Sequence, residues 1–158
     1  MVEYQSEKLK DLLKAMVRCC GERMAQEAKR LGLPHSEMEC LELFDGERYL
    51  TTKGIAQRLG VAKSRVTRIV DGLVAKKLVL RSDDPNDARV KLIALTPAGR
   101  KKAEEIESIL HENHRRVLLQ LPSGERNRVM TAMETLWTAM ETVKADLDQD
   151  EDRSLETG

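Results

Sequence analysis

The sequence predicts a mainly α-helical fold with one small β-hairpin, and two observations lead to this prediction. Aromatic residues make up only 3% of the 158 residues while hydrophobic residues make up 41%, so the core must consist of aliphatic and small side chains, which favours helices packed on helices. Apolar residues recur at helical spacing along most of the chain, and β-prone runs occur in one region only.

The two ends of the chain are predicted to form long amphipathic helices. The first covers about residues 6–31, and another begins at Thr96-Pro97 and ends near Gln120. In the last helix the apolar residues are spaced alternately by four and three, which is a heptad seam. The chain's own core or a partner chain could cover this seam; we expect a homodimer, because little else in the chain could cover the flanking helices. The expected dimerisation residues are Leu9, Leu12, Leu13, Met16, Val129, Met133, Leu136, Met140, Val143 and Leu147.

The middle of the chain is predicted to form a winged helix-turn-helix. A helix that begins at Thr51 or Thr52 stops at Gly60, and a second short helix covers about residues 63–76. Two short helices joined by a turn that contains glycine are typical of a helix-turn-helix. A β-hairpin with a polar tip would follow as the wing. Its two strands and its tip are expected at residues 78–80, 90–95 and 82–89.

The expected domain organisation follows from these elements. Residues 33–96 would form the winged helix-turn-helix, and residues 1–32 and 97–147 would form a helical dimerisation region built from both termini. Residues 148–158 are acidic and poor in apolar side chains, which predicts a disordered tail. Because the sequence contains no run of about 18 apolar residues and no apolar stretch at its start, we expect a cytoplasmic protein without a membrane partner.

The zero net charge of the chain conceals a strong segregation of charge. Residues 1–50 have a net charge of −2, residues 51–102 of +9 and residues 103–158 of −7. Because salt screens each charge beyond about 10 Å, the local charge decides whether a surface attracts DNA phosphates. The central third could therefore be a nucleic-acid face, although a solvated basic surface explains the charge equally well.

The sequence resembles the MarR family of multiple-antibiotic-resistance regulators over about residues 6–147. The resemblance is carried by the motifs IAQRLGV, KSRVTRIVD, DPNDAR and LTPAG, which begin at residues 55, 63, 84 and 95. It implies a triangular α/β dimer with interlocked terminal helices, two lobes that contact successive major grooves of a pseudo-palindromic operator, and wing tips in the flanking minor grooves. It also implies a transcriptional regulator, and a repressor that responds to a small-molecule effector or another signal.

Three residues depart from the family's pattern. Ala62 stands where relatives often have a capping Ser or Thr. Lys77 occupies a usual glycine position and would have to adopt a left-handed conformation. Gly72 lies inside the second short helix and should weaken it by up to about 1 kcal/mol relative to alanine.

The residues expected to contact DNA lie on this second helix and on the wing. We expect Arg65 to contact a base edge and Arg68 a base or a phosphate, with Ser64 and Thr67 beside them, since a helix of this kind fits the major groove. The alternative is two exposed arginines on an ordinary helix.

Arg89 beside the hairpin tip could enter a minor groove. Asp87 could orient it, as in relatives with the same pattern, or could form a purely structural salt bridge with it. Lys63, Lys91 and Thr52 are weaker candidates for phosphate contacts, which position a protein without selecting a sequence.

Redox, metal and catalytic sites receive less support. Cys19 and Cys20 lie on the first helix, where some relatives sense oxidants; we expect buried, inert thiols, with Cys19 the better candidate for a sensor. His111 and His114 are three residues apart and could share a metal with another helix, but we expect no metal and no cofactor. No catalytic constellation or nucleotide-binding loop is evident, so we expect no enzyme.

The sequence favours one of three classes of function. The leading hypothesis is a DNA-binding transcriptional regulator that acts as a homodimer, with an oxidant-sensing regulator as a variant of it. A winged-helix module that binds only proteins would have lost its recognition and wing arginines, but Arg65, Arg68 and Arg89 are present. An enzyme would need a convergent polar site.

Overall fold

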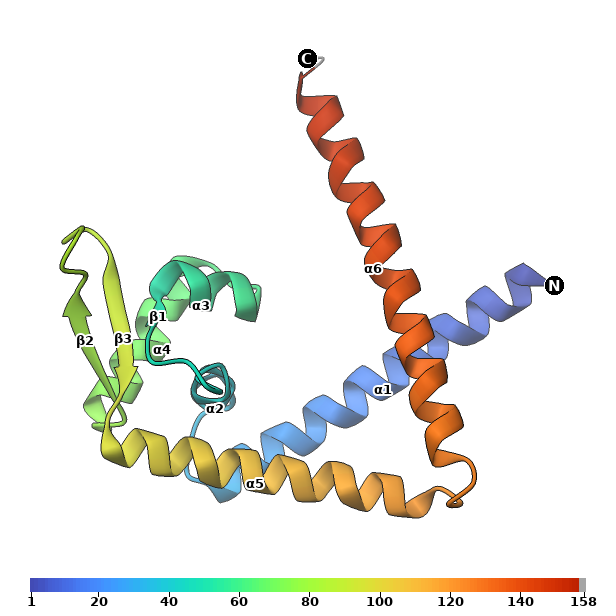
Figure 1. Cartoon of the computed structure of the whole chain (residues 1–158), viewed down its shortest axis with the longest axis horizontal. Helices are drawn as coiled ribbons and strands as arrows, with labels where there is room; N and C mark the ends of the chain where they lie inside the picture. Colours follow the sequence, from blue (N-terminus) through green and yellow to red (C-terminus); the bar gives the residue numbers. More distant parts are fainter. Residues whose placement is uncertain (157–158) are drawn as a thin grey trace. The chain divides into compact units, whose positions relative to one another are not determined.

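The computed structural model describes the backbone of residues 1–156 and the side chains of residues 1–147. The described chain is mostly helical, with three short antiparallel strands, as the sequence predicts (Figure 1). It divides into two compact units, residues 1–110 and 111–158, and each unit is described by itself. The expected boundaries at residues 32/33 and 96/97 stay a prediction.

The first unit contains most of the elements. Its helices are α1 (Val2–Arg30), α2 (His35–Glu42), α3 (Thr52–Leu59), α4 (Lys63–Ala75) and the first part of α5 (Pro97–Gln120), and its strands are β1 (Leu50–Thr51), β2 (Val79–Asp83) and β3 (Lys91–Leu95). Individual residues set where these helices begin and end. Gly32 and Gly60 adopt left-handed conformations after α1 and α3, which glycine does without a steric cost, and the Thr51 hydroxyl accepts a hydrogen bond from the Gly54 amide at 3.0 Å.

The predicted hairpin is present and belongs to a slightly larger sheet. Strands β2 and β3 pair antiparallel, and β1 adds to the other edge of β3, where Leu50 lies opposite Ile93. The described chain has one large hydrophobic core, which lies in the first unit beneath this sheet and the short helices. Its fully buried larger side chains are Met38, Leu41, Ile55, Leu73, Ile93, Ile106, Val66, Val70, Val79 and Cys40.

The start of α5 is fixed against the turn between α4 and β2. The Thr96 amide donates to the Leu78 carbonyl at 3.0 Å, and the Thr96 hydroxyl accepts from the Gly99 amide at 2.9 Å. A Cβ on Gly99 would lie 1.8 Å from the Leu78 carbonyl oxygen, so this close approach requires glycine. Lys77 in the same turn has a φ of 58°, which confirms the expected left-handed conformation.

The second unit consists of the rest of α5 and of α6 (Arg126–Glu156). None of the described side chains of residues 111–147 is buried. The helix α6 continues to Glu156, into the segment for which a disordered tail is predicted, because no glycine or proline interrupts the chain between Gly124 and Gly158. The side chains from residue 148 onward lie outside the described residues.

Candidate nucleic-acid interface

Helices α3 and α4 form the predicted helix-turn-helix. They pack against each other through residues of the core, and the left-handed Gly60 begins the turn between them. Ala62 is the N-cap of α4 and supplies no side-chain hydrogen bond, as the sequence predicts. The first amides of α4 therefore lack a side-chain cap, and such amides favour anionic groups.

The two faces of α4 differ sharply in character. Val66, Ile69, Val70 and Leu73 are buried, and this stripe fixes which side of the helix points outward. The recognition-helix residues, defined here as Ser64, Arg65, Thr67 and Arg68, are all exposed. The Thr67 hydroxyl donates to the Lys63 carbonyl at 3.1 Å and keeps its oxygen available as an acceptor. The structure thus places the four predicted residues on one exposed face.

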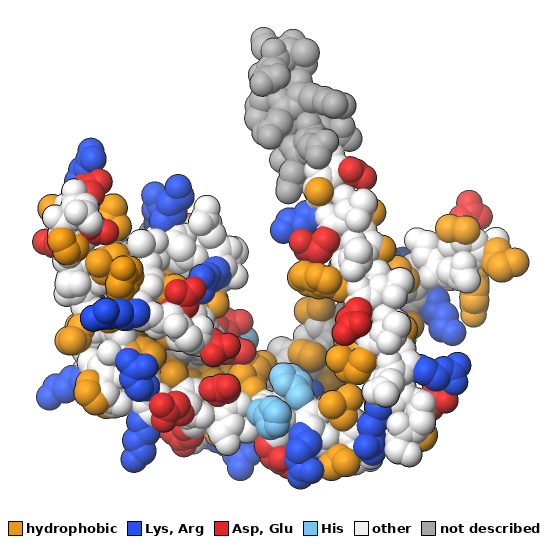
Figure 2. Space-filling model, in the orientation of Figure 1, with side chains coloured by type: hydrophobic (Ala, Val, Ile, Leu, Met, Phe, Trp, Pro, Cys, Tyr) orange, Lys and Arg blue, Asp and Glu red, His pale blue; other side chains and the backbone are white. Residues whose placement is uncertain are grey.

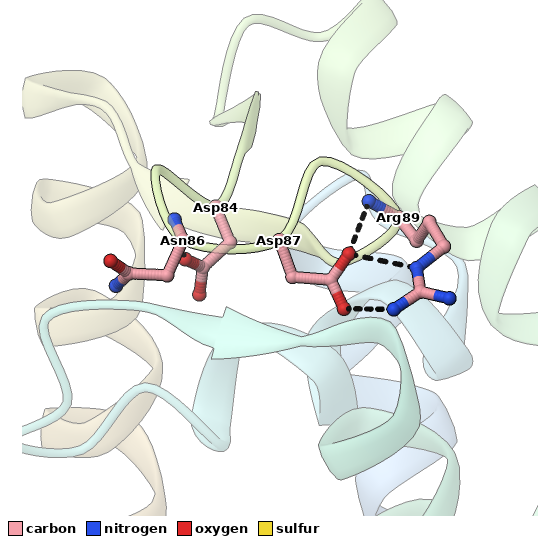
Figure 3. A network of polar contacts seen from close by, with 4 residues as sticks. All are labelled: Asp84, Asn86, Asp87 and Arg89. Atoms are coloured by element: carbon pink, nitrogen blue, oxygen red, sulfur yellow. Dashed lines mark hydrogen bonds and ion pairs between the residues drawn. The ribbon is translucent and has the colours of Figure 1, made fainter.

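The tip of the wing is a tight turn organised by two aspartates (Figure 3). The Asp84 carboxylate accepts from the Asn86 amide at 2.7 Å. The Asp87 carboxylate accepts from both the backbone amide and the Nε of Arg89, each at 3.0 Å, and its second oxygen accepts from Nη2 at 3.2 Å. Asp87 therefore holds both the backbone and the guanidinium of Arg89.

The Asp87–Arg89 pair leaves the arginine accessible. The Arg89 side chain is 91% exposed, whereas that of Asp87 is 40% exposed. Hydrogen bonds from Arg89 lower the pKa of Asp87 below its ordinary value, and the same contact raises the pKa of Arg89. Both groups stay charged near neutral pH. The pair fits the orienting role and the purely structural role equally well.

The three weaker candidates for phosphate contacts lie in different surroundings. Lys63 is exposed at the first turn of α4, and Thr52 is half-buried at the first turn of α3. Lys91 lies opposite Asp83 in the hairpin and forms an ion pair with it. Its charge is therefore partly neutralised within the wing.

Ion pairs that the sequence did not reveal hold the winged part together. Arg81 on β2 donates to Asp71 on α4 at 2.7 Å, which ties the base of the hairpin to α4. Arg58 on α3 donates to Glu47 at 2.8 Å and to the Leu43 carbonyl at 3.2 Å. The partners are at least ten residues apart and follow no periodic pattern, so only the fold shows them.

The basic central third is on the surface. Every lysine and arginine from residue 51 to residue 101 is exposed, and Figure 2 shows Lys and Arg side chains over the hairpin and the helices beside it. The predicted segregation of charge thus becomes a basic surface on the helix-turn-helix and the wing.

The predicted dimerisation residues lie on α1 and α6. Leu9, Leu12 and Met16 are exposed on α1, and Leu13 is half-buried. On α6, Val129 and Leu136 are half-buried. The remaining four are between 46% and 62% exposed, namely Met133, Met140, Val143 and Leu147.

The prediction for the cysteines was wrong. Cys19 and Cys20 are exposed, and it is Cys40 that is buried. The reason is that only Glu27 and Ala28 of α1 are buried, so the apolar stripe that includes Cys20 does not belong to the core. Among the described residues, no group of three or more His, Cys, Asp or Glu side chains could hold a metal ion, and no described helix has the length and hydropathy needed to cross a membrane.

The segment that carries this geometry is similar to known proteins. A family model described as MarR family matches residues 31–90, the segment that contains the helix-turn-helix and the wing tip. This segment is therefore similar to the MarR family. The HTH-type transcriptional regulator TcaR of Staphylococcus aureus is 34% identical over 90 residues, which are 55% of this chain and 59% of TcaR. The chain therefore matches less than two thirds of the length of that relative.

Solved structures extend the likeness in fold beyond the segment that the family model matches. A mutant of MarR from E. coli has a TM-score of 0.73 at 21% identity, covering 82% of this chain and 96% of that one. The S. aureus MepR–DNA complex has a TM-score of 0.65 at 24% identity, covering 82% of this chain and 95% of MepR. These likenesses confirm the predicted winged-helix fold.

Proposed function

We propose that this chain is a sequence-specific DNA-binding regulator of transcription that binds a pseudo-palindromic operator as a homodimer. The observation that carries the proposal is the exposed face of α4, where four residues suited to DNA contact stand opposite a fully buried stripe. The named relatives are transcriptional regulators, and the MepR structure contains DNA, which supports the same function here. Access to an operator would require a cytoplasmic location.

In this proposal α4 enters the major groove. Arg65 donates to a base edge, for which guanine is the best acceptor, and Arg68 contacts a base or a phosphate. Ser64, Thr67, Lys63 and the uncapped amides of α4 bind phosphates and set the register of the helix.

The wing tip enters the adjacent minor groove. Arg89 would be the inserted side chain, because it is the most exposed partner of the described ion pairs and Asp87 holds its guanidinium in one orientation. An oriented arginine loses less conformational freedom on binding than a free one does. Lys91 and Thr52 would add weaker contacts to the backbone.

A second copy of the chain would cover the exposed apolar faces of α1 and α6. An apolar seam that remains about half exposed is a surface on which association is favourable. The second unit has no buried described side chain, so it lacks a core of its own without a partner. Two protomers would then hold their α4 helices about 34–36 Å apart, one helical turn of DNA.

Binding of the dimer to its operator would repress transcription by occupancy. A small-molecule effector or another signal would relieve repression by changing the separation of the two α4 helices, because the affinity for a two-site operator depends on that distance.

Selection of bound fragments from genomic DNA, followed by footprinting, tests the proposal. Arg89→Ala should weaken operator binding more than tenfold and leave dimerisation intact, and Arg65→Ala should also reduce discrimination between operator and mismatched DNA. Arg115→Ala is the matched control, since Arg115 forms a similar exposed ion pair with Glu112 outside the proposed interface. Unchanged affinity of Arg89→Ala at physiological salt would refute the wing assignment.

A second candidate function is regulation by oxidants through Cys19 or Cys20. The exposure of Cys19 on α1 favours it, because oxidation requires access, whereas Cys20 lies on the apolar stripe that a second copy would cover. Peroxide should then release the wild-type protein from its operator but not the Cys19→Ser/Cys20→Ser variant. Equal release of both proteins would exclude this candidate.

A further inference from the structure

A buried carboxylate lies between α2 and the recognition helix. Glu37 on α2 is 5% exposed and is one of two charged residues buried in the described chain. Lys76 is the residue that directly follows α4, and its Nζ donates to Glu37 Oε1 at 2.9 Å. The other carboxylate oxygen, Oε2, is buried without a hydrogen-bond partner among the described residues. Burying a carboxylate is costly unless it is paired and hydrogen-bonded, and here Lys76 supplies the partner of one oxygen only.

Gly72 makes room for this carboxylate. A Cβ at position 72 would lie 2.2 Å from Glu37 Oε1 and 3.1 Å from its Cδ, so any other residue would require the Glu37 carboxylate to move from its present position. Gly72 has no left-handed conformation, so what distinguishes this position is the close approach of the Glu37 side chain. Gly72 and Lys76 are four residues apart and share one face of the helix. Together they form a notch and a cationic clamp, which we call the Glu37 joint.

The same segment of α2 also faces the other end of α4. Pro34, Ser36 and Glu37 line a cleft of about 470 Å³ together with Ser64, Arg65, Arg68 and Ile69. The start of α2 thus lies beside the N-terminal half of α4 through this cleft and holds the C-terminal half through the joint. Helices α2 and α4 pack against each other, so an ion pair at the C-terminal end of α4 limits the sliding of α4 along α2.

We propose that Glu37 is a positioning residue for DNA recognition, which acts through the joint by fixing α4 on α2 so that Arg65 and Arg68 face the groove. Glu37 itself does not touch DNA. This inference rests on the proposed function, because it assigns α4 to the major groove. Base contacts are directional, so a small displacement of α4 should reduce specific binding far more than binding to phosphates.

A double-mutant cycle tests the joint with and without DNA. Gly72→Ala should lower the urea midpoint of the wild-type chain, because the new methyl group would displace the Glu37 carboxylate from its pairing with Lys76. The same substitution should leave unchanged or raise the midpoint of Glu37→Ala, in which the notch is empty. If Gly72→Ala changes the urea midpoint by the same amount and in the same direction in the wild-type chain and in Glu37→Ala, the proposed Glu37 joint is refuted. This readout needs no operator and stands even if the proposed function fails.

The DNA readout is the ratio of affinities for operator and for a scrambled duplex. Gly72→Ala should reduce this ratio about tenfold while changing the affinity for scrambled DNA less than about threefold. The ratio of the double variant Glu37→Ala/Gly72→Ala should match that of Glu37→Ala within about twofold. The ratio of Glu37→Gln should be higher than that of Glu37→Ala, because the glutamine amide oxygen can still accept from Lys76. If the wild-type protein prefers the operator and both Gly72→Ala and Glu37→Ala keep the wild-type ratio of affinities, the positioning role is overturned. The proposed function would then still stand.

Discussion

Lys77 offers a direct test of how the turn after the recognition helix is built. Its φ of 58° lies in the left-handed region, which is unfavourable for a residue with a Cβ. Three backbone interactions hold it there: the Lys77 and Leu78 amides each donate to α4 carbonyls at 2.9 Å, and the Lys77 carbonyl accepts from the Thr96 hydroxyl at 2.7 Å. Because none of them uses the lysine side chain, glycine could make all three.

The expected size of the effect follows from two opposing contributions. A lysine in this conformation costs about 1–2 kcal/mol, and glycine loses about 0.5–1 kcal/mol more backbone entropy on folding. Lys77→Gly should therefore raise the free energy of unfolding by about 0.5–1 kcal/mol. Lys77→Ala is the control, since it removes the charge but keeps the Cβ, and its stability should remain within about 0.5 kcal/mol of the wild-type value.

Urea unfolding followed by circular dichroism measures both variants. All samples must have the same protomer concentration, because the stability of a dimer depends on concentration. A Lys77→Gly variant that is no more stable than Lys77→Ala would show that the left-handed conformation is not costly at this position.

Three further predictions concern packing and the cysteines. Gly99→Ala should destabilise the fold by about 2 kcal/mol or more in urea unfolding, because its methyl group would meet the Leu78 carbonyl, whereas Gly124→Ala, with nothing within 4 Å, should have little effect; equal effects would refute the close approach. Burial, with the charge of Glu37, raises the pKa of Cys40 from 9.0 to about 12, so the unfolded chain ionises first and stability is lost as the pH rises above 9.0. The destabilisation caused by Cys40→Ala should therefore shrink by about 2 kcal/mol between about pH 8 and about pH 10.5, and a constant difference would contradict this. In the Cys19→Ser/Cys20→Ser variant, the remaining thiol should react with a thiol reagent in urea but not in the folded state; fast reaction of the folded protein would place Cys40 at the surface.

The parts of the fold that local chemistry determines could be predicted from the sequence. The stop at Gly60, the helix start at Thr96-Pro97 and the left-handed Lys77 each depend on a few adjacent residues, and the structure has all three. The exposed face of α4 also followed from the spacing of its apolar residues.

The sequence could not reveal features that depend on distant residues. Gly72 looked like a defect in a helix, because the side chain that approaches it, Glu37, lies thirty-five positions earlier in the chain. Asp71 and Arg81 meet only because the wing folds back onto α4. The exposure of Cys19 and Cys20 was missed because an apolar stripe has the same spacing whether it covers a core or awaits a partner.

Native mass spectrometry of the wild-type chain mixed with its selected operator fragment tests the central claim most directly. The proposed function predicts complexes with two chains per duplex, and no comparable complex at the same concentration with a scrambled duplex of equal length. Complexes with a single chain, or equal occupancy of both duplexes, would contradict recognition of a two-fold DNA site by a paired winged helix-turn-helix.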